Sequence, residues 1–158
     1  RPGIKWTNDL VFGTRKTAGI LTELSVVAET METDYVIVGI GVNCAHAEFP
    51  EELRDIATSL RIETGKAVSR CALAAALLRE FSRMEDALLT DREAWLREFS
   101  EHCVTIGKDV RIVRAGEERI AHADGIGPEA ELLVTYPDGT TGAVASGEVS
   151  VRGMYGYL

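Results

Sequence analysis

Four charged or amide side chains lie close together near the start of the chain, beside apolar residues. They are Lys5, Asn8, Asp9 and Lys16. A polar ligand would explain such a cluster, because buried polar groups without partners are costly. A lysine placed just before small residues such as Gly19 can direct its ammonium toward a carboxylate or phosphate oxygen. The competing interpretation is a surface hairpin with solvated charges, which would be preferred for any one of these residues alone.

A second polar position follows a glycine-containing apolar run, GIGVN at residues 39–43. Asn43 ends this run, at the end of a predicted strand, where ligands often lie in sheet-based folds. The third glycine and the helix start of a dinucleotide-binding loop are absent. By itself, the motif therefore predicts only a tightly packed strand end.

The elements that must position these residues begin with strands, since residues 4–44 are strand-like throughout. Residues 17–27 and 35–40 are rich in β-branched and aliphatic side chains, with the acidic turn 32–34 between them. They predict an antiparallel pair. The nearly unbroken apolar run at 36–42 predicts a strand covered on both faces by helices.

Helices are predicted in the middle of the chain. Pro50 suits the first turn of a helix that runs through Glu51, Leu53 and Ile56. A second helix is expected over residues 69–89, because its apolar residues recur at three- and four-residue spacing and form one core-facing stripe. The stripe contains Leu73, Leu77, Phe81, Met84 and Leu88. Thr90 and Glu93 form a capping-box pattern that predicts a third helix ending near 101–102.

After Cys103 the pattern changes to short strands separated by glycine-containing turns. These strands are expected at residues 104–106, 110–113, 120–123, 132–135 and 147–151. Five short strands over such a length predict a small barrel. The expected fold class is therefore α+β, with a partial mixed or antiparallel sheet and covering helices in domain 1–103 and a barrel in domain 104–158.

Composition narrows the compartment and the partners. A formal charge of −8 argues against a surface that coats nucleic acid. Cys44, Cys71 and Cys103 are odd in number and lack metal-ligand spacing, which favours buried thiols in a reducing cytoplasm. No apolar run approaches the roughly 20 residues of a membrane span. The chain starts at Arg1, directly before its motifs, so we expect a truncated N-terminus.

Four ordered blocks resemble those of biotin–protein ligases. They are KWTNDL at residues 5–10, KTAGILTE at 16–23, GIGVN at 39–43 and SGEVSVR at 146–152. The segments FPEEL at 49–53 and ATSL at 57–60 also look like the family's connecting region. The resemblance covers essentially the whole chain, and it implies the end of a class II synthetase-like catalytic domain followed by an SH3-like barrel.

The resemblance implies an ATP-dependent reaction in two steps. Biotin and ATP form biotinyl-5'-adenylate, and a lysine of a carboxylase carrier domain then takes the biotin. Lys16 would be catalytic and would bind biotin together with Gly19. The nucleotide side would be formed by Lys5, Asn8, Asp9, Asn43 and Arg152, with Glu148 beside Arg152. Mg²⁺ is implied as the partner of ATP, with Asp9 as its candidate ligand; a homodimer is possible.

Two departures from the family pattern affect these expectations. Thr7 stands where the family has proline, so we expect a less rigid loop around Asn8 and Asp9. The family's Gly/Arg-rich phosphate loop would precede Arg1, so we expect this segment alone to bind biotin and ATP weakly.

Three alternatives remain open. They are a bifunctional biotin-operon repressor whose DNA-binding domain lies elsewhere, a lipoate ligase-like protein, and a non-catalytic binding module.

Overall fold

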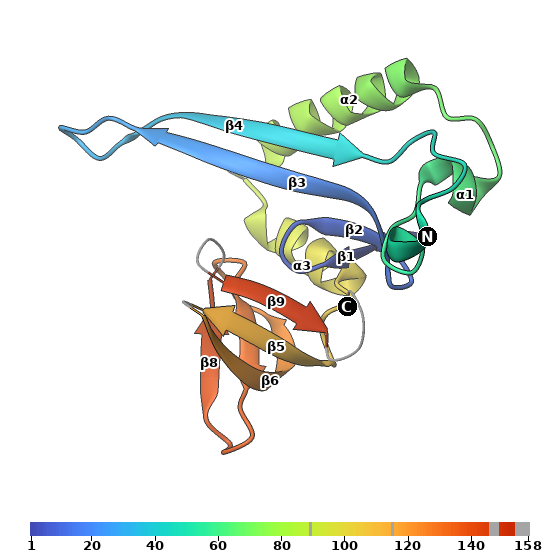
Figure 1. Cartoon of the computed structure of the whole chain (residues 1–158). Coiled ribbons are helices and arrows are strands. Elements are labelled where there is room, and N and C mark those ends of the chain that lie inside the picture. Colours follow the sequence, from blue (N-terminus) through green and yellow to red (C-terminus); the bar gives the residue numbers. More distant parts are fainter. Residues whose placement is uncertain (89, 115, 146–148, 154–158) are drawn as a thin grey trace.

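The chain forms two antiparallel sheets connected by helices (Figure 1). The computed structural model describes residues 1–88, 90–114, 116–145 and 149–153. The first sheet has the order β1 (Gly3–Lys5), β2 (Asp9–Phe12), β3 (Arg15–Val26) and β4 (Thr33–Val42). It is followed by the 3-10 turn η1 (Glu51–Leu53) and the helices α1 (Leu60–Thr64), α2 (Arg70–Leu88) and α3 (Arg92–His102).

The second sheet follows the helices. Its strands are β5 (Asp109–Arg114), β6 (Glu117–Ile126), β7 (Leu132–Thr135), β8 (Thr141–Val144) and β9 (Val149–Gly153), in the order β8-β7-β6-β5-β9. The α+β content and the antiparallel pairing agree with expectation. In the part of the chain that the structure describes, β8 and β9 each have one neighbouring strand, so the hydrogen-bonded order does not close on itself.

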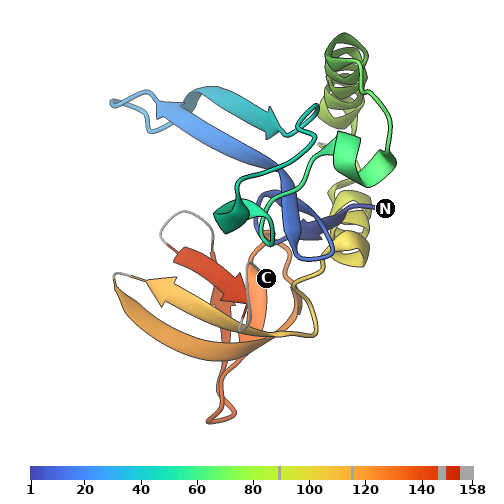
Figure 2. The same ribbon diagram turned by 45° about the vertical axis from the view of Figure 1, so that its right-hand side comes forward.

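Strands β3 and β4 form a long hairpin that extends away from the rest of the molecule (Figure 1). Its tip is closed by bonds between Val27 and both Glu32 and Met31, slightly earlier than the predicted turn. The predicted coverage of residues 36–42 is wrong for this chain, because Val36 is 49% and Ile37 is 51% exposed. The rotated view shows why: α2 stands apart from the hairpin (Figure 2).

Helices α2 and α3 agree with the sequence pattern in position but differ in their contacts, whereas the helix predicted after Pro50 is only the 3-10 turn η1 and α1 was not predicted. Helix α2 covers nearly all of the predicted 69–89 range, yet its stripe is half-buried at Leu73 and Phe81 and lies outside the main core. The predicted capping box at Thr90 is wrong. Asp91 is the N-cap of α3, because its carboxylate accepts a hydrogen bond from the N–H of Ala94 at 3.3 Å. An aspartate one position later is an equally good cap.

The strand predictions succeed for β5, β6, β7 and the described part of β9. The predicted strand at 104–106 is a turn that leads into Gly107, whose φ of 77° is left-handed. Strand β8 was not predicted, because Gly142 and Ala143 at the centre of its sequence TGAV are depleted in strands and interrupt the pattern of Thr141 and Val144. Cys44 and Cys103 are buried as expected, whereas Cys71 is exposed. None of the helices in the described residues is long and apolar enough to span a membrane.

The main core lies in the second sheet and includes one residue from the start of the chain. Its buried members are Trp6, Cys103, Val110, Ile112, Ala121, Ala123, Leu132, Val134 and Val144. Trp6 is 3% exposed. Its backbone N–H donates to Thr105 Oγ1 at 2.9 Å, and its indole Nε1 donates to the carbonyl of Ala130 at 3.0 Å. The Trp6 side chain therefore fastens the start of the chain to the second sheet.

Replacing Trp6 with alanine should lower the free energy of unfolding by about 3–5 kcal/mol, because a large buried ring and its hydrogen bond are lost. Denaturant unfolding of the full-length gene product measures this. Trp95→Ala is the matched control, since Trp95 is only half-buried on α3 and lies outside the core cluster. Equal losses in the two variants would mean that Trp6 is not a special anchor.

Candidate functional site

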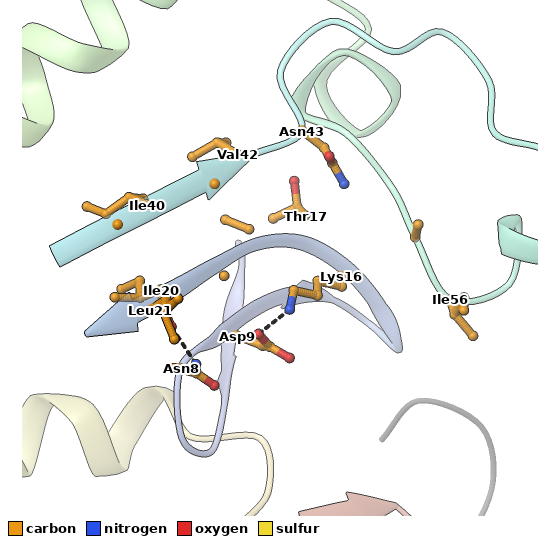
Figure 3. A pocket seen from close by; sticks show the side chains of 15 residues that line it. Asn8, Asp9, Lys16, Thr17, Ile20, Leu21, Ile40, Val42, Asn43 and Ile56 are labelled. Carbon is orange, nitrogen blue, oxygen red and sulfur yellow. Dashed lines mark hydrogen bonds and ion pairs between the residues drawn. The ribbon is translucent and has the colours of Figure 1, made fainter. Parts of the chain in front are cut away.

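A pocket of about 860 Å³ lies where the β3–β4 hairpin joins the body of the chain (Figure 3). Its walls come from the β1–β2 loop, β2, β3, β4 and the segment 56–57. Of the predicted site residues, five line this pocket: Asn8, Asp9, Lys16, Gly19 and Asn43. Residues far apart in the sequence are thus brought together in one pocket.

Lys16 and Asp9 form an ion pair in this pocket, with Nζ and Oδ1 2.5 Å apart. The Asp9 side chain is 12% exposed and the Lys16 side chain 38% exposed. The carboxylate thus holds a cationic group at the pocket wall while leaving part of it accessible. Such a group can interact with a carboxylate or phosphate oxygen of a bound molecule.

A β-bulge at Thr17 brings Lys16 to the same side of the sheet as Asp9. In the β2–β3 register, Leu10 is opposite Ala18 and Val11 is opposite Lys16, so Thr17 is the extra residue. Asp9 and Val11 share one face of β2 because side chains alternate along a strand. Their partners Gly19 and Lys16 therefore share that face as well, although an odd spacing would separate them in a regular strand. Bulges commonly redirect side chains beside functional sites.

Three glycines form a flat floor beside this pair. Gly19 is opposite Gly41, and Gly39 is opposite Leu21, so all three lie on one face of the hairpin. A Cβ on Gly19 would lie 2.8 Å from Lys16 Nζ and 3.0 Å from Asp9 Oδ1, so a side chain there would displace the ion pair. At Gly41 a Cβ would meet only a backbone oxygen at 3.9 Å. The space above Gly41 is therefore open to a ligand.

The two asparagines are fastened at the pocket's edges. The Asn8 side-chain amide donates to the carbonyl of Ile20, and Ile20 N–H donates back to Asn8 at 2.9 Å. The Asn43 Nδ2 donates to the carbonyl of Thr58 at 3.1 Å. The peptide bond between Trp6 and Thr7 is cis. The expected lower rigidity of this loop stays a prediction.

Two predicted site residues are not placed in the pocket. Lys5 is 8% exposed and lies opposite Asp9 in the β1–β2 register, but it is not among the lining residues. The backbone of Arg152 is opposite Arg111 in the second sheet. Its side chain, and all of Glu148, lie outside the described residues.

Sequence reasoning missed Thr17 and Thr58. Thr17 lines the pocket, 2% exposed, and its Oγ1 has no hydrogen-bond partner in the described part of the chain. Thr58 is fully buried beside the pocket. The ATSL block was the available signal for Thr58, but the sequence does not reveal what its hydroxyl contacts.

The donor set does not build a resident metal site. In residues 1–88, 90–114, 116–145 and 149–153, no group of three or more His, Cys, Asp or Glu side chains could hold a metal ion. The carboxylate that lines the pocket, Asp9, is already paired with Lys16. It could serve at most as one ligand of a Mg²⁺ ion that arrives with a nucleotide.

Known proteins similar to this chain are biotin–protein ligases. The biotin–acetyl-CoA-carboxylase ligase of Mycobacterium tuberculosis is 31% identical over 151 residues, which are 93% of this chain and 52% of that protein. The bifunctional ligase/repressor BirA of Bacillus subtilis is 31% identical over 137 residues, 86% of this chain and 42% of that protein. Over most of its length, this chain is therefore similar to biotin–protein ligases. It spans about half the length of the curated relatives it matches.

Solved biotin–protein ligases share this fold. A structure of the Aquifex aeolicus enzyme has a TM-score of 0.85 and 27% identity, covering 96% of this chain and 65% of the other. The same ligase in complex with biotin and ATP has a TM-score of 0.81 and 26% identity, with 96% and 62% coverage. No family model matches the chain.

Gly41→Val in the full-length gene product should weaken ligand binding in this pocket at least ~10-fold, with biotin as the probe, because the new side chain would occupy the open space above the floor. Folding should be retained, since no protein atom closer than 3.9 Å opposes the added Cβ. Isothermal titration calorimetry measures the affinity. Gly125→Val in β6 is the matched control, because a Cβ there meets nothing within 4 Å and Gly125 lies outside the pocket. Unchanged biotin affinity in Gly41→Val would show that the floor does not contact the ligand.

Proposed function

We propose that the protein containing this chain is an ATP-dependent ligase that forms biotinyl-5'-adenylate and transfers the biotin to a lysine of a carboxylase carrier domain. The observation that carries the proposal is the Lys16–Asp9 pair over a glycine floor in a pocket of about 860 Å³. The similarity to curated biotin–protein ligases, and to a ligase that was solved with biotin and ATP, supports it.

In the first step, a carboxylate oxygen of biotin attacks the α-phosphorus of ATP, and pyrophosphate leaves. The α-phosphoryl group develops additional negative charge as the new bond forms. Lys16 would stabilise that charge, and Asp9 would hold its ammonium in place. Gly19 would let the reacting groups approach the backbone closely. Mg²⁺ would reduce the negative charge of the ATP phosphates.

In the second step, the amine of the carrier lysine attacks the carbonyl of biotinyl-adenylate, and AMP leaves. Lys16 would again stabilise negative charge, here on the departing phosphate. Before it loses its proton, the carrier lysine is a positively charged ammonium group. The negatively charged carboxylate of Asp9 would orient it. Asn8 and Asn43 would bind the nucleotide part from the two edges of the pocket. For Lys5 and Arg152, the proposed nucleotide contacts rest on the family resemblance alone.

We infer a catalytic part over residues 1–103 and an SH3-like barrel over 104–158, and the five-stranded order of the second sheet supports the latter. The acceptor would be the carrier domain of acetyl-CoA carboxylase, as the name of the mycobacterial relative suggests. The expected location is the cytoplasm.

Lys16→Ala should lower kcat for biotinyl-adenylate formation by about 10²–10³-fold, the usual loss when one charge-stabilising donor is removed. Pyrophosphate release by the full-length gene product, with biotin and Mg-ATP, measures it. Lys108→Ala is the control, since Lys108 is exposed and outside the pocket. A Lys16→Ala enzyme with full activity would refute the role of Lys16. An unaltered protein that makes no biotinyl-adenylate would refute the function itself.

A further inference from the structure

Thr58 connects the two sides of the pocket through its backbone. Its N–H donates to the carbonyl of Lys16 at 2.8 Å, and its own carbonyl accepts a hydrogen bond from Asn43 Nδ2 at 3.1 Å. The N–H of Lys16 donates to the carbonyl of Ile56 at 2.8 Å. The segment around Thr58 therefore pairs with β3 at the bulge, where the β4 ladder has already ended at Val42.

The Thr58 side chain is held in turn by an ionic group on helix α1. Thr58 is fully buried, and its Oγ1 donates to Glu63 Oε1 at 2.6 Å. The same carboxylate oxygen accepts from Arg15 Nη2 at 2.8 Å. Arg15 is the neighbour of Lys16 on β3, so the network returns to the strand from which it started. Hydrogen bonds to a charged carboxylate are stronger than those between neutral groups.

We propose that Thr58, oriented by Glu63 and Arg15, is a positioning residue that holds Lys16 and Asn43 at the distance the reaction requires. This inference rests on the proposed function and deepens it. Thr58 touches neither substrate nor reacting atoms in this scheme. It acts by restraining the bulged end of β3 against the end of β4, where a small misplacement of a catalytic group reduces the rate strongly.

A purely structural role would have a different signature. Loss of a buried hydroxyl that only stabilises the fold would lower the melting temperature without changing turnover of the molecules that remain folded. A positioning role predicts that kcat falls more than KM changes, and that the loss depends on Lys16 being present. Measuring kcat and KM for a Thr58 variant, a Lys16 variant and the double variant distinguishes the two roles.

The experiment compares Thr58→Val, Thr58→Ser, Lys16→Ala and the Thr58→Val/Lys16→Ala double variant in the full-length gene product. Valine keeps the shape but loses the hydroxyl, whereas serine retains it. Thr64→Val is the matched control, because its hydroxyl also makes a 2.6 Å hydrogen bond on α1, to the carbonyl of Leu60, but contacts neither Lys16 nor Asn43. The rate of pyrophosphate release with biotin and Mg-ATP gives kcat and KM.

Thr58→Val should lower kcat by about 10–100-fold, the scale expected for displacement of a catalytic group. Thr58→Ser should restore most of that loss, and Thr64→Val should stay near the unaltered enzyme. In the Lys16→Ala background, most of the Thr58→Val effect should disappear. A Thr58→Val enzyme with normal kcat, or an undiminished effect in that background, would overturn the proposal.

Hydrogen exchange provides a second readout that needs no catalysis. The amides of Lys16 and Leu60 donate to the carbonyls of Ile56 and Asn43, so both should exchange at least ~10-fold faster in Thr58→Val than in Thr64→Val. The amide of Ala123 in the second sheet should be unchanged. If the unaltered protein forms no biotinyl-adenylate, the proposed function fails, and exchange alone then decides whether Thr58 holds the strands. Unchanged exchange of the Lys16 and Leu60 amides in Thr58→Val would overturn the proposal that Thr58 holds the two strand ends.

Discussion

The extra residue at Thr17 in β3 is the constraint on which the pocket depends. It changes the alternation of side chains along the strand, so that Lys16 lies on the same face as Asp9 and Gly19. Without a Cβ at Gly19, the ammonium and the carboxylate can lie directly against the strand. The bulge, the absence of a side chain at Gly19 and the Lys16–Asp9 ion pair together place the ammonium at the pocket wall. All three are needed for that position.

The surroundings of the bulge compensate for the ladder that it interrupts. On one edge, β2 continues the pairing through Val11, and on the other the segment 56–58 supplies hydrogen bonds that β4 no longer provides. The loop before β2 is fastened separately, because Trp6 is buried in the core of the second sheet. The pocket is therefore restrained from three directions, by segments that lie far apart in the sequence.

The sequence predicted the composition of the pocket better than its geometry. Lys16, Asp9 and Asn43 could be identified because charged and amide groups beside buried strands need partners. Their order and spacing also matched the family's blocks. The position of Lys16 relative to Gly19 could not be derived, because a bulge depends on how two strands pair and not on either strand alone.

Other differences have the same physical origin. The hydrophobic run at 36–42 correctly predicted a strand, but burial depends on which element packs against it. In the described residues, Val36 and Ile37 stay exposed because α2 lies elsewhere. Likewise, Thr90 and Asp91 are both acceptable helix caps, and only the path of the chain out of α2 selects Asp91. Local preference restricts the choices, and tertiary contacts select among them.

The exposure of Lys16 argues that its pairing with Asp9 serves positioning more than stability. An ion pair with one partner 38% exposed contributes little to folding, because solvent screens the attraction and both side chains lose freedom. The same partial exposure leaves the ammonium able to interact with an incoming anion. A ligand carrying several negatively charged oxygens would attract Lys16 more strongly than one carboxylate does. Asp9 would then act as a resident counter-ion that keeps the lysine aimed before such a ligand arrives.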